Sequence, residues 1–284
     1  MWARMCVCSR NFGLVINGIR TAALVPFADM LNHYRPRESK WQFDDTLQGF
    51  TITAVQKISV GAQVYDSYGQ KCNHRFLLNY GFSVENNVEP DGFCPNEVAI
   101  LLALRKSDHL YNHKFALMRE QCFPSRRVRV CVGDNENSRL MFAMLRIIEA
   151  DQQEIDLFFD SSRSIRDAQI PRTICNEVKA LQHLKQICDE YLGNYPSTFE
   201  EDVNRLSLPS VAPFSNERHA IIQVKGEKQV LLFYKDFAET GLSFLNITEE
   251  TLFFLEFNSI KNKKHILIQN YIKSLLPLVR NNFK

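Results

Sequence analysis

Two short motifs contain the side chains that could bind a ligand or take part in a reaction. The first, Leu24–His33 (LVPFADMLNH), contains Asp29, Asn32 and His33. Such side chains can hold a ligand, but they are also common where a chain reverses, because they bond to nearby backbone groups. Taken alone, this motif leaves two alternatives, a ligand site and a polar turn after a short strand.

The second motif, residues 65–73 (YDSYGQKCN), places Tyr68 before Gly69, and the aromatic residues Tyr80 and Phe82 follow it. Tyrosines are ordinary in β-rich cores, where the ring is buried and the hydroxyl finds a polar partner. Neither tyrosine alone therefore distinguishes core packing from an aromatic binding wall.

Patterns of metal ligands are weak in this chain. Cys6 and Cys8 are separated by one residue, whereas zinc knuckles use two to four, and no second pair follows. His109 and His113 have the spacing of ligands on one helix face, but no glutamate lies between them, so the metalloprotease pattern is absent. We expect two half-exposed helix histidines and no metal.

Composition indicates a globular protein with no global preference for a charged partner. The 284 residues are 45% hydrophobic and 23% charged, and the net charge is +2. This balance predicts no general attraction to nucleic acids or anionic membranes, and the basic stretch 126–129 is too short to change that. No apolar run reaches the ~18 residues of a membrane span.

The location is predicted from the N-terminal sequence and the cysteines. The first ten residues lack the basic-then-apolar pattern of a signal peptide. Because the chain is also long, its eight cysteines are expected to be reduced thiols. We expect a cytoplasmic protein, with the nucleus as a second location left open.

Hydrophobic periodicity predicts short strands and turns over residues 20–93. The expected strands are residues 20–26, 41–45, 49–55 and 62–68, with 46–48 as the turn of a hairpin. The first is expected to be a buried strand, because it is apolar and ends at Pro26. Residues 73–80 are expected to form a short helix with Asn73 as its N-cap.

From about residue 95 onward the pattern becomes helical. Helices are expected at residues 137–150 and 172–192, and within 216–233 and 250–279. After Glu256 the chain contains no acidic residue and six basic ones, namely Lys261, Lys263, Lys264, Lys273, Arg280 and Lys284. A solvated helix face is the default for such a run, and an acidic partner is the alternative.

In this order and spacing, the two motifs resemble the C-terminal half of a SET domain. They are similar to the branch typified by the Rubisco large-subunit lysine methyltransferase, in which a Pro-x-x-Asp-x-x-Asn-His segment, here 26–33, and a Tyr-Gly segment, here 68–69, cross in a pseudoknot. Ser9-Arg10-x-Phe12 resembles the preceding helix end, and the stretch 216–231 resembles the family's helical domain.

The resemblance implies an α+β fold in two domains. Residues 1–93 would be the C-terminal part of the SET domain with its pseudoknot. Residues 94–284 would be the all-helical, Rubisco-methyltransferase-type substrate-binding domain. The family's first strands carry a Gly-x-Gly segment that binds the cofactor, and no two glycines of this chain stand two apart. We therefore expect the N-terminal part of the SET domain to be missing, and the same absence excludes a Rossmann-type methyltransferase.

The resemblance also implies a function, which is transfer of methyl groups from S-adenosylmethionine to a lysine of a protein substrate. This in-line displacement needs alignment of the amine and the methyl carbon more than acid–base groups. The cofactor's sulfonium is cationic, so aromatic faces around it are favourable. The amine must be neutral, which costs roughly 4–5 kcal/mol near pH 7 for a lysine of pKa ~10.4. A dry channel of tyrosines lowers that pKa and serves better than one of carboxylates.

Matched positions in the family imply a role for each site residue. Tyr68 would be catalytic at the methyl-transfer channel. The cofactor would be bound by Asn32, His33, Arg10, Asp29, Tyr68 and Phe82, and the substrate lysine by Tyr80, Phe82 and Arg10. For Arg10 and Asp29 a buried ion pair that braces the pseudoknot remains an equal alternative.

Two other functions stay open. The chain as it stands could be a catalytically incomplete remnant whose helical domain still binds a protein, and cofactor binding would separate that from an enzyme. One branch of the family methylates a histidine of actin, and an imidazole is already neutral near pH 7. The expected partner is in each case a protein, with no metal, membrane or nucleic acid.

Overall fold

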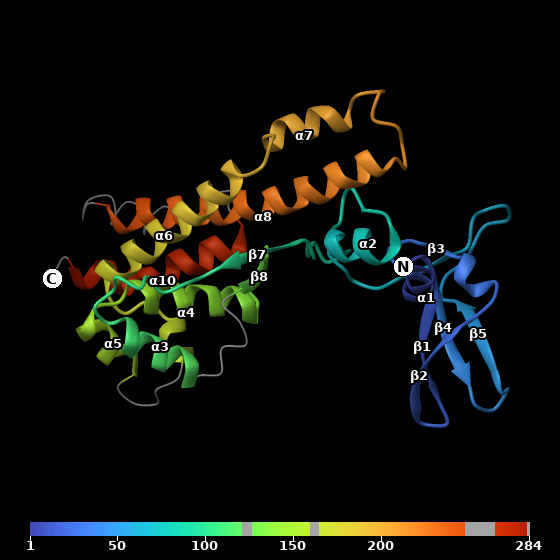
Figure 1. The fold of residues 1–284 in the computed structure, drawn as a ribbon, viewed down its shortest axis with the longest axis horizontal. Coiled ribbons are helices and arrows are strands. Elements are labelled where there is room, and N and C mark those ends of the chain that lie inside the picture. The colour runs from blue at the N-terminus through green and yellow to red at the C-terminus, as the bar shows by residue number, and fades with distance from the viewer. Residues whose placement is uncertain (121–126, 160–164, 248–264, 283–284) are drawn as a thin grey trace. The chain divides into compact units, whose positions relative to one another are not determined.

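The computed structural model describes residues 1–120, 127–159, 165–247 and 265–282. Two compact units are present (Figure 1). The first unit comprises residues 1–96 and 204–224, and the second comprises residues 97–203 and 225–284.

The first unit contains pairs of short strands and short helices. Its strands are β1 (Asn11–Ile16), β2 (Ile19–Leu24), β3 (Asn32–His33), β4 (Ser39–Asp44), β5 (Gly49–Ala54) and β6 (Tyr65–Asp66). Its helices are α1 (Trp2–Arg10), the 3-10 turn η1 (Ala28–Met30), α2 (Asn73–Tyr80) and the beginning of α8 (Asn216–Leu245). Strands β1–β2 and β4–β5 form antiparallel hairpins, whereas β3 pairs with β6 in parallel.

The predicted hairpin is confirmed as β4–β5, with Asp44 opposite Gly49. The β1–β2 hairpin was not predicted, although Asn17-Gly18 between the strands is a strong turn signal. Both turn residues have positive φ angles, 49° for Asn17 and 78° for Gly18, as a two-residue turn between twisted strands requires.

The prediction that residues 20–26 form a buried strand is half wrong. The strand exists as β2, but most of its residues are exposed. The buried residues lie instead in its partner strand β1, and they are Phe12 and Leu14. The ring of Phe12 lies 5.2 Å from Trp41 and 5.1 Å from Phe50, so β1 packs against the β4–β5 hairpin. Among the described residues, β1 is the only strand paired with β2.

The parallel pair β3–β6 brings the two sequence motifs together. Asn32 lies opposite Tyr65 and His33 opposite Asp66, and the Tyr34 N–H donates to the Asp66 carbonyl over 2.9 Å. The strand predicted over residues 62–68 is therefore only Tyr65–Asp66. A parallel pair needs a long crossover, which here includes the whole β4–β5 hairpin.

Helix α2 has the predicted bounds, Asn73–Tyr80, but a different cap. Its N-cap is Cys72, and Asn73 lies inside the helix with its side chain buried. The Asn73 amide bonds to both backbone groups of Val84, over 2.9 and 2.8 Å, so it fixes the chain that follows the helix. Gly81 ends the helix at φ 81°, a left-handed position that glycine adopts without steric cost.

Residues 204–224 belong to the first unit through contacts with residues 83–85. The Ser83 N–H donates to Nδ1 of His219 over 3.1 Å, and Arg218 donates to the Glu85 carboxylate over 2.7 Å. Leu206, Val211, Ile221 and Ile222 form a small buried cluster in this segment.

The second unit is mainly helical. Its elements are β7 (Glu97–Leu101), α3 (Tyr111–Glu120), β8 (Arg127–Cys131), α4 (Glu136–Glu149), α5 (Gln152–Phe159), η2 (Ile165–Gln169), α6 (Ile174–Gly193), α7 (Phe199–Leu206), the rest of α8, and α10 (Ile266–Asn282). The helices predicted at residues 137–150 and 172–192 are confirmed as α4 and α6.

Strands β7 and β8 correct the expectation of an all-helical second part. They form an antiparallel pair with Glu97 opposite Cys131, and their alternate residues, Val98, Ile100, Val128 and Val130, are buried in the main core. Of the basic stretch 126–129, residues 127–129 lie in β8, and Arg126 lies outside the described residues. His113 lies in α3, but His109 precedes that helix, so the two do not share its face.

Three helices of the second unit meet closely at Gly241. A Cβ at this position would lie 2.8 Å from the Leu181 side chain and 3.0 Å from the Tyr271 ring, so α8 crosses α6 and α10 where only glycine has room.

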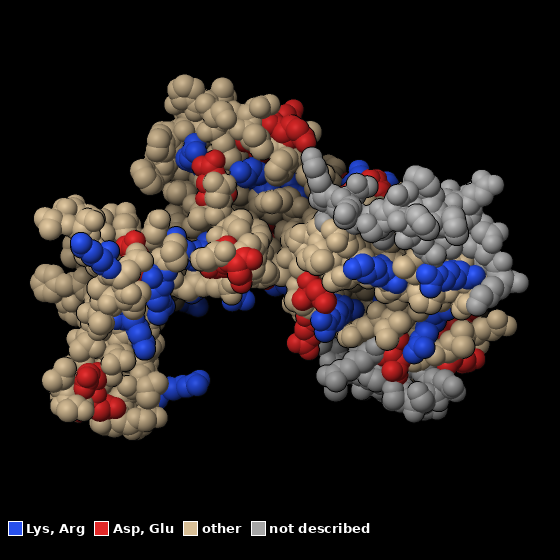
Figure 2. Space-filling model, turned by 180° about the vertical axis from the view of Figure 1, so that it is seen from behind, with Lys and Arg blue, Asp and Glu red and all other residues tan. Residues whose placement is uncertain are grey.

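Basic and acidic side chains are intermingled on the face in Figure 2, without a large region of one sign. Of the basic residues after Glu256, Lys261, Lys263, Lys264 and Lys284 lie outside the described residues, and Lys273 and Arg280 lie in α10. No described helix is long and apolar enough to cross a membrane, and no three potential metal ligands gather within the described ranges.

Candidate functional site

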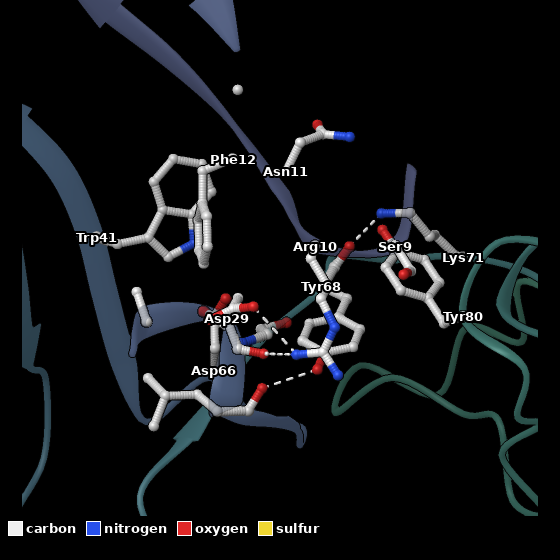
Figure 3. A pocket seen from close by; sticks show the side chains of 14 residues that line it. Ser9, Arg10, Asn11, Phe12, Asp29, Trp41, Asp66, Tyr68, Lys71 and Tyr80 are labelled. Carbon is white, nitrogen blue, oxygen red and sulfur yellow. Dashed lines mark hydrogen bonds and ion pairs between the residues drawn. The ribbon is translucent and has the colours of Figure 1, made fainter. Parts of the chain in front are cut away.

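Two neighbouring cavities of the first unit meet at Tyr68. The large cavity has a volume of about 770 Å³ and is lined by every residue that the sequence predicted for the site, namely Arg10, Asp29, Asn32, His33, Tyr68, Tyr80 and Phe82. The small cavity has a volume of about 200 Å³ (Figure 3). Both are lined by Ser9, Arg10, Asp29, Tyr68 and Tyr80. A ligand in one cavity could therefore meet a ligand in the other beside Tyr68.

A cluster of aromatic rings surrounds Tyr68. Its ring centroid lies 4.8 Å from Tyr80, 5.2 Å from His33 and 6.1 Å from Phe82. Sequence reasoning missed Phe76, which is fully buried and lies 4.8 Å from His33 and 5.2 Å from Phe82. The signal was present, because Phe76 and Tyr80 are four residues apart in the predicted helix and so share one face.

Tyr68 is held at both ends by the first motif. Its backbone N–H donates to Nδ1 of His33 over 3.0 Å, and its hydroxyl donates to the Leu31 carbonyl over 2.7 Å. Burial raises the pKa of the Tyr68 hydroxyl above its usual value, and the nearby Asp66 carboxylate acts in the same direction. The hydroxyl therefore stays protonated at neutral pH, with its oxygen lone pairs still able to accept a hydrogen bond.

His33 is a neutral imidazole with a defined tautomer. Burial lowers its pKa to about 4, and the charges of Arg35 and Lys71 add to the effect. Because Nδ1 accepts a hydrogen bond, the ring proton must be on Nε2. Nε2 is buried and has no hydrogen-bond partner among the described residues. This N–H is a donor that a bound ligand could satisfy.

The depressed pKa of His33 predicts how stability depends on pH. His33 has a pKa near 6.5 in the unfolded chain and about 4 in the folded one. Between these values the unfolded chain therefore binds a proton that the folded chain does not. The contribution of neutral His33 to the free energy of unfolding is complete above pH ~6.5. It is lost as the pH falls toward 4, by at most about 1.4 kcal/mol per pH unit. Urea unfolding at pH 7 and pH 5 tests this, because H33Q should lose less stability than the unsubstituted chain over that interval. An equal loss in both would contradict it.

Arg10 and Asp29 form the ion pair that was left as an alternative, but the pair is not buried. Nη1 of Arg10 lies 3.1 Å from the Asp29 carboxylate and donates to the Asp29 carbonyl over 3.0 Å. The side chains are 53% and 23% exposed, because the pair lies on the walls of both cavities rather than in a core. Bracing by a buried pair is therefore wrong, and Arg10 is free to contact a ligand.

The small cavity corrects the expectation of a channel without carboxylates. Asp66 lines it together with Trp41, Phe12 and Tyr68. Its carboxylate accepts the Ser67 N–H over 2.6 Å, and burial raises its pKa. The parallel pairing of β3 and β6 places this carboxylate here, and no sequence pattern within residues 65–73 indicated which way it would face.

Lys71 is a second charged group of the small cavity. Its ammonium donates to the Tyr68 carbonyl and lies 5.8 Å from the centre of the Tyr80 ring. Burial and the charge of Arg75 lower its pKa. The cavity is therefore lined by aromatic, polar and charged side chains, with the Asp66 carboxylate and the Lys71 ammonium near Tyr68.

The comparisons with known sequences find similarity to a substrate-binding family and to methyltransferases. Residues 105–231 match the family described as Rubisco LSMT substrate-binding. Actin-histidine N-methyltransferases are similar over 74% of this chain, with 27% identity for the rat protein, 28% for the mouse protein and 27% for the human protein. The chain spans about 35% of the length of these curated relatives.

Solved structures show the same fold. The SET domain of LSMT, crystallised with lysine and AdoHcy, matches 95% of this chain and 62% of its own, with a TM-score of 0.66 and 19% identity. Rubisco LSMT bound to AdoMet matches 95% of this chain over 61% of its own length, with a TM-score of 0.65 and 19% identity. The predicted resemblance and α+β fold are confirmed, and the family match places the similarity to Rubisco LSMT substrate-binding domains at residues 105–231.

Proposed function

We propose that this chain is an S-adenosylmethionine-dependent protein methyltransferase that modifies a lysine side chain. The observation that carries the proposal is the position of Tyr68, which both motifs hold where the two cavities meet. The similarity to actin-histidine N-methyltransferases and to Rubisco LSMT supports methyl transfer to a protein.

The large cavity has the size and chemistry that S-adenosylmethionine needs. Its volume of about 770 Å³ lies within the ~300–1,000 Å³ of ordinary ligand pockets. The rings of Tyr68, Tyr80 and Phe82 offer faces to a sulfonium cation. The unpartnered N–H of His33 offers a donor.

Within this proposal each side chain has a separate task. When bound, the cofactor supplies a methyl group on a positively charged sulfur. Asn32 and His33 bind it with Arg10, Asp29 and Phe82, whereas Tyr68 and Tyr80 enclose the reacting end. The Tyr68 hydroxyl keeps its proton and donates it to the Leu31 carbonyl, so its oxygen can accept an N–H from the target amine and orient the lone pair.

The small cavity favours lysine over histidine as the target. An ammonium group entering it would meet the Asp66 carboxylate and the aromatic rings of Trp41 and Phe12, beside the cations of Arg10 and Lys71. The amine must lose its proton before it reacts. Asp66, whose pKa burial raises, is a better proton acceptor than an ordinary carboxylate. A neutral imidazole would need neither property.

The proposal extends to both parts of the chain. Residues 1–93 contribute the C-terminal part of a SET domain, and residues 94–284 act as the substrate-binding domain that holds the target protein. The match of residues 105–231 to the Rubisco LSMT substrate-binding family supports the second assignment.

The first test is a calorimetric titration of S-adenosylmethionine into the 284-residue chain. We expect saturable binding that weakens at least about tenfold in N32A, because a lining amide is lost from the large cavity. Tyr111, a residue of the second unit, provides a control, and Y111F should bind like the unsubstituted chain. Absence of binding by a folded sample would contradict the proposal and favour a protein-binding remnant.

The second test identifies the modified residue. The chain is incubated with methyl-labelled cofactor and either total cell protein or purified actin, and the protein is hydrolysed to amino acids. We expect the label in methyl-lysine. Label in methyl-histidine of actin would instead assign the activity named for the similar mammalian proteins.

A further inference from the structure

A third cavity belongs to the second unit and shares no lining residue with the two cavities of the first unit. Its volume is about 390 Å³, and it is lined by the end of α6, the turn 194–198, the first turn of α7 and one face of α8. Its surface is mainly apolar and includes Leu192, Tyr195, Pro196, Phe199 and Leu232. Nothing in the proposed function uses this cavity.

A buried lysine of α8 fixes the turn that forms one wall of this cavity. Nζ of Lys228 donates to the carbonyls of Ser197 and Thr198 over 2.6 and 3.3 Å, and to the Ser197 hydroxyl over 3.0 Å. The Lys228 side chain is 1% exposed, and Asp202, its ion-pair partner at 2.6 Å, is 3% exposed. The wall is therefore preformed, and the charge of its buried cation is matched by Asp202.

Two further carboxylates on the cavity wall give it an excess of negative charge. Glu200 and Glu201 lie in the first turn of α7, and both residues are exposed. Glu201 accepts the Thr198 N–H over 2.7 Å. Within the part of the chain that the structure describes, neither glutamate has an ion-pair partner, and the Glu200 carboxylate has no hydrogen bond. The cavity is therefore an apolar pocket with two unmatched acids beside it.

We infer that this cavity docks a segment of a partner protein in which a large apolar side chain lies between arginines or lysines. The apolar side chain enters the cavity, and the flanking cations meet Glu200 and Glu201. Such an anchor supplies most of the binding free energy, while complementary charges at the rim select the partner. The inference goes beyond the proposed function, because docking here needs neither the cofactor nor methyl transfer.

The test measures binding of short peptides to the 284-residue chain by fluorescence anisotropy. The first labelled peptide has a phenylalanine between two pairs of arginines. The second has serine in place of the phenylalanine, and the third has glutamates in place of the arginines. We expect the first peptide to bind at least about tenfold more tightly than either of the others. The second loses the burial of the ring, and the third meets carboxylates of its own sign.

Substitution of one glutamate locates the binding site. E200Q should weaken binding of the first peptide by about threefold at low salt, and this difference should shrink at about 0.3 M salt, where exposed charges are screened. Glu136 provides the matched control, because it is also exposed in the first turn of a helix of the second unit but does not line the cavity. E136Q should therefore bind the peptide like the unsubstituted chain.

Equal binding of the three peptides, or equal affinities of E200Q and E136Q for the first peptide, would overturn the inference. Both outcomes are independent of methyl transfer. If the chain binds the first peptide with the expected preference but does not bind S-adenosylmethionine, the proposed function fails and the docking cavity is supported.

Discussion

Replacing Tyr68 with phenylalanine is expected to slow methyl transfer by about 100-fold or more while S-adenosylmethionine still binds. The substitution keeps the ring, which lies 4.8 Å from Tyr80 and 5.2 Å from His33, so the aromatic wall remains. It removes the hydroxyl that donates to the Leu31 carbonyl over 2.7 Å. The amine then loses the acceptor that orients it at the meeting point of the cavities.

The physical reason is alignment rather than acid–base chemistry. Burial raises the pKa of the Tyr68 hydroxyl, so it carries its proton throughout the neutral range and does not serve as a base there. What it provides is a fixed oxygen, and a displacement of about 1 Å in such an arrangement can cost about 100-fold in rate. The loss should therefore appear in kcat and should be independent of pH between 6 and 8.

Tyr65 offers the matched control. It lies in the same strand, β6, and lines the large cavity but not the small one. Y65F should retain at least about a third of the activity, because Tyr65 does not line the small cavity that the target amine enters. Rates are measured as label transferred from the cofactor to protein, and affinities by calorimetry. A Y68F variant as active as Y65F would contradict the role given to Tyr68.

The sequence predicted those parts of the site whose signals are local. The Asn-His motif contains strand β3, and the Tyr-Gly motif begins with strand β6. The parallel pairing of these two strands joins the motifs, as the resemblance implied. Helix α2 was predicted with its observed bounds from the local pattern of residues 73–80, although its N-cap is Cys72 and not Asn73.

Features that depend on distant partners could not be predicted in the same way. Burial of β1 rather than β2 depends on the β4–β5 hairpin, and pairing of β7 with β8 bridges a segment that contains a helix. The direction of the Asp66 side chain follows from the register with His33. Phe214 reaches the large cavity only through bonds between the start of α8 and residues 83–85. Each of these contacts is set by packing, which a pattern within one segment does not contain.

The second unit contains an ion pair with almost no exposed surface. Arg146 of α4 and Glu177 of α6 have side chains that are 2% and 1% exposed, and two hydrogen bonds of 2.6 and 2.8 Å join them. Arg146 also donates to the carbonyls of Ala168 and Gln169, and the Tyr271 hydroxyl of α10 donates to Glu177. The pair therefore connects helices α4, α6 and α10 with η2. All of these hydrogen bonds involve the charged group of Arg146 or of Glu177.

E177Q is expected to destabilise this unit by about 3–5 kcal/mol, because it leaves the Arg146 cation buried without its counter-charge. The glutamine has the same shape, so the loss comes from charge and not from packing. Urea unfolding followed by far-ultraviolet circular dichroism measures the change, since the unit is mainly helical. Replacing both partners, as in R146M together with E177L, should recover most of the stability, because no buried charge then remains.

Arg139 and Asp134 provide a control with nearly the same geometry and a different environment. Their two hydrogen bonds measure 2.7 and 2.8 Å, but the side chains are 55% and 53% exposed. D134N should change the stability far less than E177Q, because water solvates the arginine that is left behind. If the two substitutions had equal effects, the cost of E177Q would come from lost hydrogen bonds rather than from an uncompensated buried cation, and the helical unit would not depend on the charge of this pair.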